Sequence, residues 1–271
     1  MNTISKLIGK FAIVSVAFIL TSTASFAALT ASDNAANAAY SGGWANGSNG
    51  GTGFGAWSLT QTTAGSGAAG QFIGNSTSVG GPGADINTSS KAFGMFGHDG
   101  APNNGTSTST RLFSGDLSVG QTFSIDIAVN FRNGQKGFDL LNSGSATIFN
   151  LNIGNPGSGD DYVVNNATTG GGSLGNTYNQ NTAFHISLTQ TTLSGGTWTV
   201  NRTGGVTSNA SGTYTGVGAG FKLYEDQTSS NANENNLFAN NMSVVPEPST
   251  VSLLLGSSAF AGFFLLRRKR A

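Results

Sequence analysis

Apolar and polar residues alternate most regularly between Gln121 and Phe131. Every second residue there is large and apolar: Phe123, Ile125, Ile127, Val129 and Phe131. Because successive side chains of a strand point to opposite faces, this pattern predicts a half-buried β-strand. Between residues 54 and 245 the chain shows no helical periodicity of useful length.

Shorter runs of the same kind predict many further strands along the chain. In chain order they are Phe54–Thr62, Gln71–Ile73, Ala92–Phe96, Ser109–Phe113, Gly137–Leu141, Ala146–Ile153, Asp161–Val164, Ala183–Thr191, Thr197–Arg202, Gly212–Tyr214, Gly220–Tyr224 and Leu237–Val245. The dipeptide Asn133-Gly134 predicts a type I′ hairpin after the clearest strand, since both residues tolerate positive φ. Short strands at this spacing favour an all-β fold, an antiparallel two-sheet sandwich over residues 54–245.

The order of features in this body is similar to that of concanavalin-like jelly-roll domains. A long strand near the middle is followed by the Gly-Phe-x-Leu strand at residues 137–141 and by a strand that contains Trp198. A right-handed β-helix is the alternative for a Gly- and Asn-rich chain, but no repeat of fixed period is present. Residues 28–53 form a Gly/Asn-rich N-terminal segment in which Ala31–Tyr40 predicts a short helix.

Both ends of the chain have the pattern of processing segments. Lys6 and Lys10 precede the apolar core 11–20, and small residues up to Ala27 predict a signal peptide at residues 1–27 that signal peptidase cleaves after Ala27. Residues 251–266 are uncharged and apolar, close to the lower length limit of a transmembrane helix. The basic cluster behind them is expected to stay in the cytoplasm: Arg267, Arg268, Lys269 and Arg270.

Pro246-Glu247-Pro248 separates the body from this apolar run. The two prolines fix φ and remove two amide donors, so the segment is expected to stay extended and unpaired. Motif, span and basic cluster in this order resemble the PEP-CTERM sorting signal of Gram-negative bacteria, which covers residues 246–271. The resemblance implies an inner-membrane intermediate, recognition by an exosortase, cleavage near the motif and release to the cell surface or extracellular matrix. Such tails are also classed as C-terminal domains of ice-binding proteins, a label that does not itself imply ice binding.

Charge and composition exclude several functional classes. The chain has 12 basic and 12 acidic residues, but the two ends hold half of the basic ones, so residues 28–246 contain six cations and eleven acids, a net charge of −5. An acidic body without a basic patch gives no reason to expect nucleic acid binding. The absence of cysteine from the sequence excludes disulfides, thiol catalysis and Cys-ligated metals.

Two motif matches lack the context that their chemistry needs. Gly171–Gly175 fits GxSxG around Ser173, but it lies among glycine and small polar residues and not between a strand and a helix. Gly65–Gly70 fits GxGxxG, but it leads into a predicted strand instead of a helix. We therefore expect no catalytic residues and predict that the protein is not an enzyme.

The remaining candidates are ligands for calcium or sugar. Asp160 and Asp161 are the best calcium candidates, with further loop carboxylates at Asp99, Asp116, Glu225 and Asp226, although no Asp-x-Asp-x-Asp loop is present. His98 and His185 have no partner at metal-ligand spacing, and the alternation places His185 on a solvated strand face. Trp44, in a glycine-rich stretch, is the candidate for exposed stacking on a sugar ring. No cofactor other than calcium is expected.

These observations predict an exported, exosortase-processed protein of the cell surface or of the exopolysaccharide matrix of a biofilm, with a structural or adhesive role. Its expected partners are signal peptidase, an exosortase and extracellular polysaccharide. The alternative is a carbohydrate-binding, lectin-like module, and a secreted hydrolase comes third.

Overall fold

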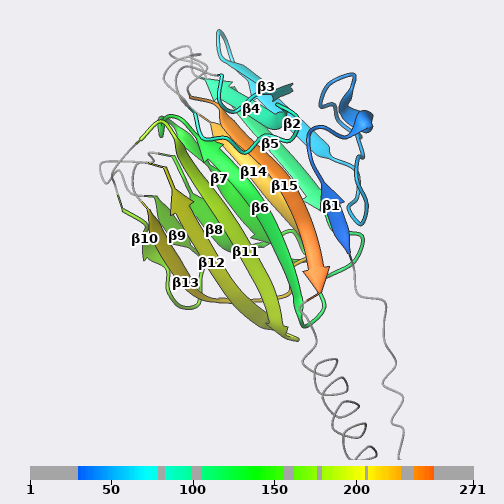
Figure 1. Ribbon diagram of the computed structural model, residues 1–271, viewed down its shortest axis with the longest axis vertical. Coiled ribbons are helices and arrows are strands. Elements are labelled where there is room, and N and C mark those ends of the chain that lie inside the picture. The colour runs from blue at the N-terminus through cyan, green and yellow to red at the C-terminus, as the bar shows by residue number, and fades with distance from the viewer. Residues whose placement is uncertain are drawn as a thin grey trace, which may run out of the picture.

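Two antiparallel sheets packed face to face account for most of the chain (Figure 1). The computed structural model describes residues 30–78, 83–98, 105–154, 162–175, 179–204, 207–226 and 235–246. Within these residues the chain forms fifteen strands and one 3₁₀ helix, η1 (Ala38–Tyr40). The predicted all-β, two-sheet antiparallel sandwich is confirmed.

The strand order of the two sheets defines the layers. The first sheet runs β13 (Ser208–Thr215), β12 (Gly195–Thr203), β11 (Thr182–Thr192), β6 (Gln121–Val129), β15 (Leu237–Pro246), β4 (Ala92–His98) and β3 (Ala68–Gly74), and β1 (Ala31–Asp33) pairs with β15. The second sheet runs β10 (Gly172–Ser173), β9 (Val163–Asn165), β8 (Thr147–Asn152), β7 (Gln135–Leu141), β14 (Gly220–Asp226), β5 (Gly105–Leu112) and β2 (Ser58–Thr63). Every strand that the alternation predicts is present with shifted ends, and β1 and β10 are additions.

The alternation in β6 places its apolar residues between the sheets, where Phe123, Ile125 and Ile127 are completely buried. Phe123 stacks on Phe221 of the second sheet, with ring centroids 5.0 Å apart. The opposite face of the first sheet is polar at Thr122 and Thr189, which are joined by a hydroxyl hydrogen bond of 2.7 Å. Toward β3 the same face carries a second apolar cluster, in which Ala84 and Ile86 pack with Ala128 and Phe238. The period-2 pattern thus gives β6 one apolar face toward the core and an outer face that is hydroxyl-lined near Thr122 and apolar near Ala128.

The hairpin predicted at Asn133-Gly134 is wrong. Strand β6 belongs to the first sheet and β7 to the second, so the connection crosses between the layers. Gly134 has a φ of 78°, but Asn133 is not among the residues with positive φ, so the turn is not of type I′. Both edges of β6 are already paired, with β11 and β15, which leaves no edge for β7.

The helix predicted over Ala31–Tyr40 is also wrong, because this stretch contains β1 and then η1. The side chains of Asn34 and Asn37 accept hydrogen bonds from the backbone N–H groups of Ala36 and Ala39, at 3.0 Å each. Such local side-chain bonds favour turns and caps over a continuous helix.

A buried ion pair fixes this N-terminal segment to the sandwich. Asp33 of β1 accepts a hydrogen bond from a terminal nitrogen of Arg111 in β5, and both side chains have an exposed fraction of 0%. The remaining donors of Arg111 reach backbone and side-chain oxygens of the segment: Gly55 O at 2.9 Å, Gly50 O at 2.7 Å and Asn49 Oδ1 at 3.0 Å. The segment is therefore part of the packed structure.

A second buried pair joins Lys136 of β7 to Glu225 of β14, with Nζ 3.4 Å from Oε1. The ammonium group also donates to the backbone oxygens of Phe131 and Asn235, and the carboxylate accepts from Leu237 N–H at 2.8 Å. Burial raises the pKa of Glu225 to about 7 and lowers the pKa of Lys136.

The predicted ends of the chain lie outside the described residues: the signal peptide with Ala27, the span Val251–Leu266 and the basic cluster Arg267–Arg270. In the described part of the chain, no helix combines the length and the apolar composition needed to cross a membrane.

We expect Asp33→Asn to lower the free energy of unfolding by about 3–5 kcal/mol, because the buried guanidinium of Arg111 loses its counter-charge. Asp126→Asn is the matched control, since Asp126 pairs with the half-exposed His185, and it should cost less than about 1 kcal/mol. Urea unfolding of the full chain in detergent micelles, followed by tryptophan fluorescence, measures both. Equal losses in the two variants would contradict the anchoring role of Asp33.

For the second pair we expect Lys136→Met and Glu225→Gln each to cost about 3–5 kcal/mol, since each leaves one charged or polar partner buried alone. The double variant should lose less than either single variant, because both charges are then removed. The same urea titration gives the coupling energy, and additive losses would contradict the pairing.

Candidate functional site

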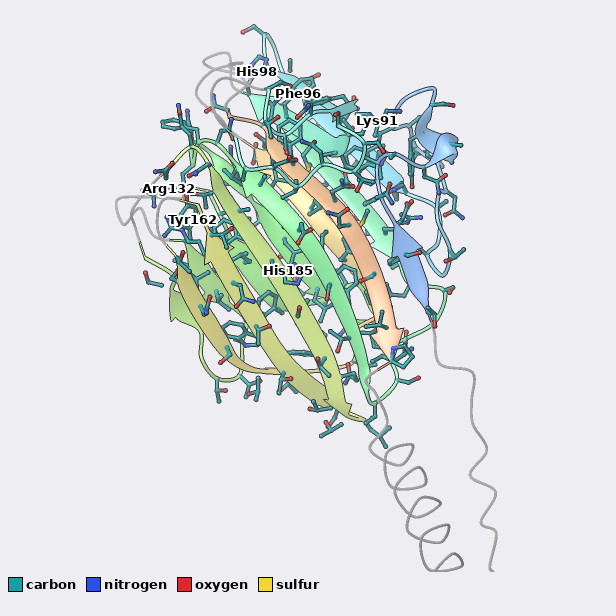
Figure 2. The ribbon with its side chains drawn as sticks, viewed as in Figure 1. Lys91, Phe96, His98, Arg132, Tyr162 and His185 are labelled. Atoms are coloured by element: carbon teal, nitrogen blue, oxygen red, sulfur yellow. The ribbon has the colours of Figure 1, made fainter. Side chains whose placement is uncertain are left out.

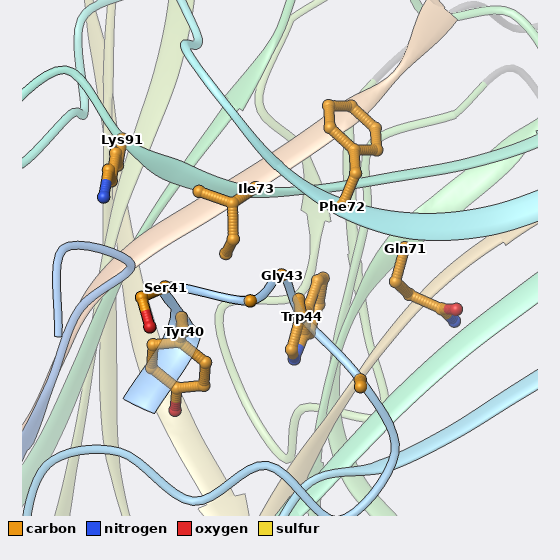
Figure 3. A pocket seen from close by; sticks show the side chains of 10 residues that line it. Tyr40, Ser41, Gly43, Trp44, Gln71, Phe72, Ile73 and Lys91 are labelled. Carbon is orange, nitrogen blue, oxygen red and sulfur yellow. The ribbon is translucent and has the colours of Figure 1, made fainter. Parts of the chain in front are cut away.

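A groove of about 550 Å³ lies between residues 40–45 and strand β3 (Figure 3). Strand β3 forms one side, where the side chain of Ile73 points toward the edge of Trp44 in the loop. The ring of Phe72 lies on the opposite face of the strand, against Phe238. Lys91 and Gln71 lie at opposite ends of the groove. The groove therefore has an apolar middle and polar ends.

The loop wall of the groove is held by Tyr40. Its hydroxyl donates to Asp33, which is the partner of Arg111, and accepts from Gly50 N–H at 3.0 Å and Trp57 Nε1–H at 3.1 Å. Burial raises the pKa of Tyr40 to about 12, so the hydroxyl keeps its proton at neutral pH. Gly43 beside it has a φ of 105°, a conformation that requires glycine here.

Lys91 ends a tight turn that begins at Thr88. Each residue donates its backbone N–H to the other's carbonyl at 3.0 Å, and the two residues between them, Ser89 and Ser90, have φ values of 50° and 61°. Positive φ at both central positions defines a type I′ turn, which residues other than Gly and Asn adopt at a cost. The side chain of Lys91 is exposed.

Asn240 of β15 is completely buried and joins the N-terminal segment to the turn at the Lys91 end of the groove. Its amide oxygen accepts from Ala35 N–H at 2.9 Å, and its amide nitrogen donates to the backbone oxygens of Ile86 and Lys91, each at 2.9 Å. Asn240 lies opposite Asp126, directly before the pairing of β15 with β6 shifts register, so its side chain points to the outer face of the first sheet, as that of Phe238 does.

The expectation that Trp44 is exposed is wrong, since only 5% of it is accessible. Its ring meets Trp57 at 75° and lies against Phe93, with centroids 4.9 Å away in each case. These contacts occupy the ring, so Trp44 offers the groove an edge and not a stacking face. Trp198, in contrast, belongs to the hydrophobic core between the sheets.

The two histidines lie on different strands, β4 and β11, which are separated by β15 and β6. His185 points away from the core on the outer face of the first sheet, as predicted (Figure 2). Its Nδ1 lies 2.5 Å from Asp126 Oδ1, and this hydrogen bond raises the pKa of His185. His98 lies at the end of β4 beside the ring of Phe96.

Several of the calcium candidates, Asp99, Asp160 and Asp161, lie outside the described residues. Asp226 accepts from Thr106 Oγ1 at 2.8 Å, and Glu225 faces the core as the partner of Lys136. Within the described ranges, no three His, Cys, Asp or Glu side chains gather in a way that could hold a metal ion.

The two motif matches have the structural context that the sequence predicts. Ser173 lies in the two-residue strand β10, and its hydroxyl accepts from Gly175 N–H at 2.9 Å. The glycine-rich stretch 65–70 leads into strand β3 and not into a helix. Neither is a nucleophile elbow or a dinucleotide fingerprint.

Sequence reasoning missed Gln71, Lys91 and Asn240. Gln71 lies in a predicted strand, but its proximity to residues 40–45 is a long-range contact that no local pattern contains. Asn240 carried a detectable signal, since a buried amide interrupts the apolar alternation of the last strand.

Three solved structures are similar to this chain at TM-scores of 0.30 to 0.32. The enzymatically active domain of tailspike protein 4 from bacteriophage CBA120 has 11% identity over 70% of this chain, which spans only 19% of that chain, at a TM-score of 0.30. The catalytic domain of PdAgaC has 7% sequence identity, the match covers 64% of this chain and 83% of that domain, and the TM-score is 0.32. The metal-free lectin I-B4 from Griffonia simplicifolia has 8% sequence identity, the match covers 70% of this chain and 93% of the lectin, and the TM-score is 0.31.

No curated protein matches the sequence. The family model of the PEP-CTERM protein-sorting motif matches residues 244–270. The first three residues of this range are the last three of β15, and Glu247 and Pro248 lie outside the described residues. The expectation that Pro246 stays unpaired is wrong, since it pairs with Gln121 of β6. At the end of a strand, a proline gives up only the last donor of the ladder. The C-terminus of the chain is thus a PEP-CTERM sorting motif, which implies an exported substrate of an exosortase.

Proposed function

We propose that this protein is a structural or adhesive component of the cell surface or of the exopolysaccharide matrix, delivered there by exosortase processing. The observation that carries the proposal is the sorting motif at residues 244–270, which continues directly from a central strand of the sandwich. The proposal includes a signal peptide cleaved after Ala27, a transient inner-membrane anchor at residues 251–266 and a concanavalin-like jelly-roll body.

The register of β1 supports presentation of the body from one end. Ala31 of β1 lies opposite Val244 of β15 in an antiparallel pair. Residues 30 and 246 therefore leave the sandwich at the same end (Figure 1). A chain held by its tail would present the opposite end of the sandwich to the surroundings.

The outer face of the first sheet supports an adhesive role. Aligned across β6, β11, β12 and β13 are the threonines Thr122, Thr189, Thr197 and Thr213. Their hydroxyl groups both donate and accept hydrogen bonds, as sugar hydroxyls do, so such a face suits contact with neutral polysaccharide. The groove beside Lys91 favours the alternative of a lectin-like module. That the protein is not an enzyme stays a prediction, as does calcium binding by Asp160 and Asp161.

Deletion of residues 247–271 should abolish delivery and leave the fold intact, because β15 ends at Pro246. We expect the full chain in the surface and matrix fractions, and the truncated chain in the periplasm or medium. Immunoblots of the fractions measure the distribution.

As a control for folding, the truncated chain should resist limited proteolysis as well as the full chain does. Surface delivery of a folded, truncated chain would contradict the role of the motif.

A further inference from the structure

We propose that the groove between residues 40–45 and β3 binds a sugar residue that carries a carboxylate, a uronic acid of an acidic polysaccharide. This inference deepens the proposed function, on which it rests, by naming the class of matrix ligand. It follows from the lining of the groove, the charge at one end and the rigidity of its walls.

The volume and lining of the groove suit a sugar. Ligand pockets typically have volumes of roughly 300–1,000 Å³ and combine apolar surface with a few fixed polar groups. The groove has a volume of about 550 Å³ and an apolar middle formed by Ile73 and the edge of Trp44. The apolar face of a sugar ring fits against such a surface, and its hydroxyls reach the rims.

Lys91 gives one end of the groove a positive charge. In the described part of the chain, Arg111, Lys136 and Lys222 each pair with a carboxylate. The guanidinium groups of the two other arginines, Arg132 and Arg202, lie over the ring of Tyr162. Lys91 is exposed and has no ion pair among the described residues. An acidic body that presents one exposed ammonium group beside an apolar groove complements an anionic sugar.

The opposite end is a fixed amide. Gln71 Nε2 donates to the backbone oxygens of Thr60 and Thr108, at 3.2 and 3.1 Å, and its Oε1 accepts from Gln61 at 2.6 Å. The amide is therefore held in one orientation. Because Gln71 lies at the end of the groove, its amide would lie beside the hydroxyl groups of a bound sugar.

The backbone of Lys91 is fixed before any ligand binds. The type I′ turn at Ser89 and Ser90 fixes its backbone, and the buried Asn240 binds its carbonyl oxygen at 2.9 Å. Because Asn240 also binds Ala35 N–H, the backbone of the lysine and the segment that leads into the loop wall share one anchor. A preformed site loses less conformational entropy on binding.

The test compares two probes that differ in charge alone: tetragalacturonate and its carboxyl-reduced counterpart with the same linkages. Calorimetric titration uses the full chain in a detergent without a sugar headgroup. We expect the charged probe to bind wild-type protein roughly fivefold more tightly, the effect of one exposed charge pair. Lys91→Gln should remove this difference, and Lys91→Arg should restore it.

Lys222→Gln is the matched control, since it removes the same charge from the second sheet and should leave both affinities unchanged. Gly42→Trp tests the groove itself. A Cβ at Gly42 meets nothing within 4 Å, so the indole can enter the groove without strain and should abolish binding of both probes. Thermal unfolding checks that each variant is folded.

Equal affinity of wild-type protein for the two probes, no binding of either, or undiminished binding by Lys91→Gln or Gly42→Trp would overturn the inference. A second measurement, the retention of the same variants in the matrix of living cells, distinguishes failure of the groove inference from failure of the proposed function. If wild-type chains are retained and no uronate binding is found, the groove inference alone fails. If wild-type chains never reach the surface, the proposed function fails.

Discussion

The buried pair of Asp33 and Arg111 is the contact on which the arrangement around the groove depends. Asp33 belongs to the first sheet and Arg111 to the second, so the pair connects the two layers at the point where the N-terminal segment joins them. Removing two charges from water is costly, and the cost is offset only when every donor and acceptor finds a partner. Here Arg111 also binds Gly50 and Gly55, lies over the rings of Phe54 and Trp57, and thereby holds the chain from residue 49 to residue 57. Tyr40 binds the same carboxylate, which extends this rigidity to the loop that forms one wall of the groove.

Asn240 performs a similar task on the outer side of the first sheet. A buried amide in a strand would be destabilising without partners, and here its oxygen and nitrogen bind three backbone groups. These groups belong to the N-terminal segment and to the stretch before β4, which have little secondary structure of their own. Two buried polar side chains, Asp33 and Asn240, thus position segments that apolar packing alone would leave free to shift.

The strands were predictable because their signal is local. The alternation from Phe123 to Val129 requires one buried face whatever the partner strand is, and the structure places these residues between the sheets. The pairing partners were not predictable, as the connection at Gly134 shows: turn chemistry indicates where the chain bends but not which sheet it enters.

The predicted exposure of Trp44 was wrong for a related reason. Glycine-rich surroundings suggest exposure, yet Trp57 and Phe93 come from separate segments to cover the ring. The groove is composed of such long-range contacts, so its residues could not be assembled from the sequence.

The sorting motif and the fold share residues, and this overlap limits which part of the motif is accessible. Val244 is completely buried and pairs with Phe123 on one side and Ala31 on the other. Opening this part of the sheet would expose the core around Phe123, so a protease would have to work against the stability of the whole domain. Pro246 pairs with Gln121 as the last residue of β15 and has no N–H with which to continue the ladder. The last strand of the sandwich therefore ends at the first residue of the Pro-Glu-Pro motif, and a cut before Pro246 would remove residues from that strand.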